Sequence, residues 1–244
     1  MNLFFSNIQS SIFTFLSSNK SLDPFLIQFG SIYENFKRIA HEDFIIQKDD
    51  NEINKLINSI INSKYIREKE KDYLVHLDKR KVNLFNASSG QQEILPLLLI
   101  LKVLRLISFS GEGAVLYIEE PEAHLFPTAQ NNVIRILIRI FNAKPEYFQY
   151  FITTHSPYIL SSFNNLIYAG YLKMTINNDK GIYKIIPKQE IVYPDAISAF
   201  SIDETKKITN IINKETLLID QNILDEVSNN ISIEFEKLMD LETN

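Results

Sequence analysis

Apolar positions in the first third of the chain recur at the spacing of an α-helix. Between residues 53 and 61 they follow one another at steps of three, one, three and one, which places them on one helix face. These positions are Ile53, Leu56, Ile57, Ile60 and Ile61. The first 82 residues are also rich in Asn, Lys, Ile and Ser. We therefore expect residues 1–82 to form a helical subdomain with one buried stripe.

The pattern changes after residue 83. A polar stretch, residues 88–93 (SSGQQE), leads into an apolar run that predicts a helix over residues 94–107. Two serines and a glycine before such a run are typical of a helix N-cap. The free N–H groups and the positive dipole end of that helix favour an anion.

Two short apolar runs downstream predict strands of a parallel sheet. The first, residues 115–118, ends on two glutamates at 119–120, and the second, residues 147–152, ends on polar residues 153–155. Pro127 suits the first turn of a helix between them. Strand, helix and strand in this order predict a parallel βαβ unit, and runs this apolar predict strands buried on both faces. Ligands bind at the carboxyl edge of such sheets.

The last third of the chain predicts a smaller extension. Residues 166–168 predict one more strand, and residues 174–176 and 182–186 flank an Asn-Asn-Asp-Lys-Gly turn that predicts a hairpin. An amphipathic helix is expected over residues 231–241. Together these elements predict a C-terminal hairpin and helical extension, residues 171–244, of the same core.

Composition narrows the class of protein. The 244 residues carry 25 Lys and Arg against 30 Asp and Glu, and the formal net charge of −5 gives no support to nucleic-acid binding. The chain has no cysteine, which excludes a disulfide framework and a thiolate zinc site. The longest apolar run, residues 94–101, is too short to span a membrane, and the opening segment lacks signal-peptide features. We expect a soluble, cytoplasmic protein with no membrane partner.

Adjacent Glu119 and Glu120 at the end of a buried strand are the sharpest chemical feature. Neighbouring side chains leave a strand on opposite sides, so the two carboxylates would occupy different environments. One carboxylate can support a metal ion through water while the other orients an attacking water. His155 ends the neighbouring predicted strand and is expected near them. The alternative is a solvated acidic loop.

The order and spacing of these segments resemble ABC-type ATPases. Within that superfamily they resemble the RecF/OLD/SMC-like, AAA-type ATPases of DNA-repair and phage-defence systems, and the resemblance is strongest over residues 84–170. It implies a parallel-sheet P-loop NTPase core at residues 83–170. The matching motifs are the signature segment at 88–92 (SSGQQ), the Walker B strand at 115–122 (VLYIEEPE), the following loop at 122–127 (EAHLFP) and the switch-histidine loop at 153–157 (TTHSP).

The resemblance implies a role for each motif residue. A nucleotide held mainly by a second subunit would be bound by the signature residues Ser88, Ser89, Gly90 and Gln91. Of these, Ser88 and Gly90 would contact its γ-phosphate. Glu119 would support Mg²⁺ through water, in the place usually taken by Asp. Glu120 would polarise the hydrolytic water, and His155 would sense the γ-phosphate. ATP and Mg²⁺ are the implied substrate and cofactor.

A phosphate-binding Walker A loop is absent from the sequence. None of the 6 glycines is followed by lysine, so no G-x-x-x-x-G-K-[ST] segment exists. The sequence therefore predicts an ATPase module whose Walker A comes from a missing N-terminal lobe or a partner. It would act by nucleotide-dependent dimerisation, as a homodimer or with that partner. Nucleic acid enters as a target by resemblance only.

Two alternatives remain open. The chain could be a non-enzymatic interaction protein that retains the ATPase fold and dimer surface. It could also be a metal-dependent hydrolase that uses Glu119, Glu120, His124 and His155 directly as ligands of Zn²⁺ or Mn²⁺.

Overall fold

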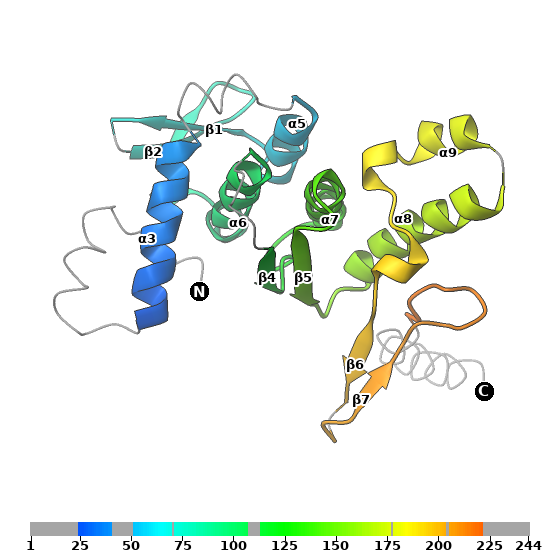
Figure 1. The fold of residues 1–244 in the computed structure, drawn as a ribbon. Helices are drawn as coiled ribbons and strands as arrows, with labels where there is room; N and C mark the ends of the chain where they lie inside the picture. The colour runs from blue at the N-terminus through cyan, green and yellow to red at the C-terminus, as the bar shows by residue number, and fades with distance from the viewer. Residues whose placement is uncertain are drawn as a thin grey trace, which may run out of the picture. The chain divides into compact units, whose positions relative to one another are not determined.

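The computed structural model describes residues 24–40, 51–69, 71–106, 113–176, 178–203 and 205–221 (Figure 1). The chain divides into two compact units, residues 1–152 and 153–244. Each unit is described by itself below.

Two helices lie in the described residues of the first unit that precede residue 61. Helix α3 spans Pro24–Ile39 and helix α5 spans Asn51–Ile60. The α5 stripe is confirmed, because Ile53, Ile57 and Ile60 are buried and Ile61, just after the helix, is completely buried. Helix α5 packs mainly on α7, the helix of the βαβ unit.

Residues 64–83 form an antiparallel sheet, and the prediction of helix up to residue 82 is wrong there. Its strands, in spatial order, are β1 (Lys64–Glu68), β2 (Lys71–Val75) and β3 (Lys81–Asn83). Tyr65 lies opposite Leu74 in the register of β1 and β2. Each strand carries aromatic or branched residues, such as Tyr65, Tyr73 and Val82, which favour β-structure, although charged residues flank them without a strict alternation.

A buried ionic cluster joins α3 to this sheet. Nζ of Lys37 lies 3.0 Å from the Asp72 carboxylate and also pairs with Glu34, and Arg67 lies within 3.6 Å of both carboxylates. The hydroxyl of Tyr65 donates to Asp72 over 2.6 Å. Because buried charges are stable only when paired, the cluster holds α3 in one register on the sheet.

Helix α6 spans Ser89–Leu106 and follows a short 3₁₀ turn, η1, at Leu84–Asn86. The helix was expected from residue 94 and begins five residues earlier. The polar signature segment therefore forms its first turn instead of preceding it. Leu95, Leu98 and Leu101 are completely buried on this helix.

The βαβ unit is confirmed. Strand β4 (Ala114–Glu119) and strand β5 (Phe148–Thr153) form a two-stranded parallel sheet, connected by helix α7 (Pro127–Ala143). Pro127 occupies the first turn of α7, as predicted. The helix buries an apolar face that contributes much of the core, made of Val133, Ile134, Ile136, Leu137 and Ile140.

One face of the parallel sheet is exposed, so the prediction of strands buried on both faces is wrong. Helices α6 and α7 lie on one side of β4 and β5 (Figure 1). On the opposite face Val115 is 50% exposed, Tyr117 79% and Phe151 48%. The rings of Tyr117 and Phe151 stack with centroids 5.0 Å apart. Whether this face is buried depends on what packs against it. The apolar run in the sequence does not show that.

Two helices replace the hairpin expected in the second unit. Helix α8 spans Pro157–Thr175 and includes residues 166–168, predicted as a strand, and helix α9 spans Asp179–Ile185. Asn178 is the N-cap of α9, and its side chain accepts from the Gly181 N–H over 3.1 Å. The Asn- and Gly-rich segment read as a turn thus starts a helix, because the same residues favour both.

The described residues after α9, 186–203 and 205–221, are irregular apart from short turns, one hairpin and an isolated bridge between Ile212 and Ile219. Two 3₁₀ turns, η2 (Lys188–Glu190) and η3 (Pro194–Ala196), precede the antiparallel strands β6 (Phe200–Ile202) and β7 (Ile208–Asn210). The helix predicted over residues 231–241 lies outside the described residues. Within the described ranges, no helix is long and apolar enough to cross a membrane.

Candidate nucleotide site

The signature segment caps helix α6. The Ser88 backbone N–H donates to Oε1 of Gln91 over 3.2 Å, and the Gln91 backbone N–H lies 3.4 Å from Oγ of Ser88. This reciprocal pair is a capping box of the Ser-x-x-Gln type. Ser88 and Ser89 are both exposed at the helix start, where free N–H groups and the helix dipole favour an anion.

Two glutamines anchor this helix start to its surroundings. Nε2 of Gln91 donates to the Ile61 carbonyl oxygen over 2.6 Å. Gln92 is buried, and its Nε2 donates to the carbonyl oxygens of Phe85 and Ala87 over 3.0 and 2.9 Å. Contacts to main-chain oxygens on both sides fix where the exposed serines lie.

Gly90 packs against the turn that follows β4, residues 120–125. A Cβ built on Gly90 would lie 2.5 Å from the carbonyl oxygen of His124. In addition, Nε2 of His124 lies 3.6 Å from the Glu93 carboxylate on α6. The start of α6 and the turn after β4 are thus in direct contact within the first unit.

Glu119 and Glu120 lie where the sequence predicted, at the carboxyl end of β4. Both are exposed. Glu120 has a φ of 44° and therefore lies in the left-handed region, where residues other than glycine are strained. Its carbonyl oxygen accepts from the Ala123 N–H over 3.0 Å. Strained residues of this kind cluster at functional sites, and this one re-aims the chain directly after the strand.

His155 follows the end of β5 and is exposed. The Ser156 N–H donates to Oγ1 of Thr154 over 3.0 Å, and Oγ of Ser156 caps α8 by accepting from the Tyr158 N–H. These bonds fix the backbone on both sides of the histidine. Because His155 belongs to the second unit and both carboxylates to the first, their expected meeting stays a prediction.

The direct metal site would need side chains from both units. No three His, Asp or Glu side chains in the described ranges gather where they could share a metal ion. The described ranges include Glu119, Glu120, His124 and His155. His155 lies in the second unit and the other three side chains in the first, so the hydrolase alternative, which needs all four as a joint ligand set, stays a prediction.

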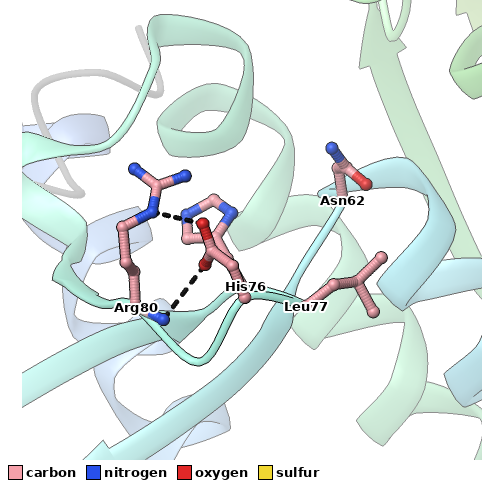
Figure 2. A pocket seen from close by; sticks show the side chains of 5 residues that line it. Asn62, His76, Leu77 and Arg80 are labelled. Carbon is pink, nitrogen blue, oxygen red and sulfur yellow. Dashed lines mark hydrogen bonds and ion pairs between the residues drawn. The ribbon is translucent and has the colours of Figure 1, made fainter.

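A separate surface pocket of about 190 Å³ lies at the turn between β2 and β3 (Figure 2). The Asp78 carboxylate in this pocket accepts hydrogen bonds from both the side chain and the backbone of Arg80. No motif residue lines it, and its charges are paired with each other. The lining residues are Asn62, His76, Leu77, Asp78 and Arg80.

Comparison with protein families supplies the assignment. The family model described as AAA ATPase domain matches residues 4–160. The chain belongs to the AAA ATPase domain family. The matched range includes the start of α6, the β4–α7–β5 unit and His155, so these elements belong to a P-loop NTPase fold with a general ATPase function. A search of curated proteins gives no match for the chain.

Three features of this AAA ATPase domain were not predicted from the sequence. The capping box was readable, because Gln91 stands three residues after Ser88. The link from Gln91 to Ile61 had no signal in the sequence, since 30 residues separate the two. The left-handed backbone of Glu120 was equally hidden, because glutamate has no preference for that region.

Proposed function

We propose that this chain is the ATP-binding and ATP-hydrolysing module of an ABC-type ATPase related to the RecF/OLD/SMC-like group. It would act by nucleotide-dependent dimerisation, as a homodimer or with a partner that supplies a Walker A loop. The DNA-repair or phage-defence setting rests on the resemblance of its motifs alone.

One observation carries the proposal: the close packing of Gly90 on the carbonyl of His124. It ties the candidate phosphate-binding helix start to the turn that begins with Glu120. A nucleotide-driven contact at the start of α6 would therefore act directly on the backbone that carries the catalytic carboxylate.

The resemblance of the motifs implies the chemistry of each side chain. The signature residues Ser88, Ser89, Gly90 and Gln91 form the nucleotide-binding helix start. Glu119 would hold Mg²⁺ through water, and Glu120 would orient the attacking water. His155 would sense the γ-phosphate. Carboxylates are suitable partners for Mg²⁺, which keeps several of its waters when bound.

The exposed face of the β4–β5 sheet supports the need for a partner lobe. Parallel sheets occur almost only with both faces covered. Here Val115, Tyr117 and Phe151 remain exposed on one face. A lobe that carries a Walker A loop could pack on this face. It would then cover the exposed side of the sheet, next to Glu119.

A second candidate function is a non-enzymatic interaction protein with the same fold and dimer surface. The observation that favours it is the absence of a G-x-x-x-x-G-K-[ST] segment from the sequence. The backbone cradle and lysine of that loop normally hold the phosphates of the nucleotide.

Titration calorimetry of Mg-ATP into the full chain tests the proposal. The Glu120→Gln variant is used so that turnover does not disturb the heat signal. Without a Walker A loop, we expect this variant to bind with a dissociation constant weaker than about 1 mM. The parent chain, with Glu120 intact, should hydrolyse ATP once a Walker A partner is added. Micromolar binding by the chain alone would contradict the need for a partner. Absence of hydrolysis in every reconstituted complex would favour the non-enzymatic function.

A further inference from the structure

The side-chain amide of Gln91 forms hydrogen bonds in two directions. Nε2 donates to the Ile61 carbonyl oxygen over 2.6 Å, while Oε1 accepts from the Ser88 backbone N–H over 3.2 Å and from the Ser88 hydroxyl over 3.1 Å. A carbonyl oxygen can only accept, so the amide nitrogen must face Ile61 and the amide oxygen must face Ser88. The partners therefore determine the orientation of the amide.

These bonds distinguish the two serines. A serine hydroxyl has one hydrogen to donate, and that of Ser88 is directed to Gln91. Ser89 is exposed, and within the described residues its hydroxyl forms no hydrogen bond in the structure. Of the two, Ser89 thus has its donor available for an incoming phosphate oxygen.

The other end of the Gln91 contact is rigid. Ile61 is completely buried and directly follows α5, which packs on α7. The Ser63 hydroxyl donates to the same carbonyl oxygen over 3.0 Å. Gln91 thus connects the cap of α6 to a fixed point in the core of the first unit.

We propose that Gln91 is a positioning residue rather than a nucleotide ligand. It keeps Ser88 as the cap of α6, joins that cap to the end of α5, and leaves Ser89 as the hydroxyl that donates to phosphate. The inference rests on the proposed nucleotide site at the start of α6.

Amide hydrogen exchange of the full chain, without nucleotide, tests the positioning role. Gln91→Met removes both contacts and should speed exchange at the Ser88 amide by roughly 2- to 10-fold. Gln91→Glu retains an acceptor for the capping box but has no N–H for Ile61, so it should keep Ser88 protected. Ser89→Ala, which removes no observed bond, is the matched control. Unchanged exchange at Ser88 in Gln91→Met would overturn the proposal.

ATP-driven association of the full chain, measured by sedimentation with a Walker A partner where one is needed, tests the division between the serines. Ser89→Ala should weaken association by roughly tenfold or more, because a bond to a charged group is lost. Ser88→Ala should weaken it less, and should add little to Gln91→Met, since both act through the cap. A larger loss in Ser88→Ala than in Ser89→Ala would overturn the assignment.

The two measurements separate the possible failures. If the parent chain shows no response to Mg-ATP with or without a partner, the proposed function fails. The exchange result at Ser88 still decides whether Gln91 holds the cap, because that measurement needs no nucleotide.

Discussion

The carbonyl oxygen of His124 occupies the space that a side chain on Gly90 would need, with a Cβ-to-oxygen distance of only 2.5 Å. His124 itself has a φ of 58° in the left-handed region. The turn after β4 therefore reaches the first turn of α6 through a strained backbone. This contact joins the two halves of the candidate site in the first unit.

Gly90→Ala should destabilise the protein although alanine is the better helix former. The added methyl group meets a backbone carbonyl, which can move only if the whole turn moves, and such overpacking costs about 1–3 kcal/mol. Urea unfolding measures the change in the free energy of unfolding. Ser89→Ala, one position away and exposed, is the control and should change that free energy by less than about 0.5 kcal/mol. Equal stability of Gly90→Ala and the parent would contradict the close contact.

Ser88→Arg should block ATP-driven dimerisation. Ser88 is exposed at the proposed nucleotide face, and a bulky side chain there would prevent close approach of a second subunit. Sedimentation with and without Mg-ATP measures the effect. Lys55→Glu reverses a charge at an exposed site on α5 and controls for a general effect of charge. Dimerisation of Ser88→Arg like that of the parent would remove the signature segment from the interface.

Glu120→Gly should make the protein more stable and at the same time abolish ATP hydrolysis. Glycine adopts a φ of 44° without the strain that glutamate bears, so relief of about 1 kcal/mol is expected in the free energy of unfolding. Glu120→Gln keeps the strain and should leave stability nearly unchanged. In a reconstituted complex both variants should lose ATP hydrolysis, because neither can polarise water. Turnover at the parent rate in either variant would exclude Glu120 from the reaction.

The parallel βαβ unit was predictable because its pattern is strong and local. Apolar runs of strand length, Pro127 at a helix start and polar strand ends all agree with one topology. The antiparallel sheet at residues 64–83 was missed because its strands are short and partly charged. The hairpin expected around residues 174–186 was wrong because Asn178 caps a helix as readily as it forms a turn.

In the candidate site, too, some features were predictable from the sequence and others were not. The positions of Glu119 and Glu120 at the end of β4 followed from the sequence, because a strand delivers its last residues to a sheet edge. The Gln91–Ile61 bond and the exposure of Tyr117 did not, since both depend on segments far apart in the chain. Long-range packing decides which polar groups meet and which faces stay open.

Tyr33→Phe should leave the protein as stable as the parent at pH 8, or more stable. Tyr33 is completely buried on α3, and its hydroxyl has no hydrogen-bond partner among the described residues. Removing an unpaired buried hydroxyl should therefore gain up to about 1 kcal/mol. Tyr65→Phe is the matched control. It removes the 2.6 Å bond to Asp72 and should cost about 1.5–3 kcal/mol.

Unfolding at alkaline pH tests whether burial keeps Tyr33 and Tyr65 protonated in the folded protein. Burial first, and then the nearby Asp72 carboxylate, raise the pKa of both Tyr33 and Tyr65 well above the usual tyrosine value. The unfolded chain releases these protons near pH 10 while the folded chain retains them. The stabilisation is therefore fully present below pH 10 and is lost progressively as the pH rises above it. Urea unfolding from pH 8 to pH 11 should show this loss, and Tyr33→Phe should reduce its slope. An unchanged slope in that variant would mean that Tyr33 titrates in the folded protein as it does in the unfolded chain.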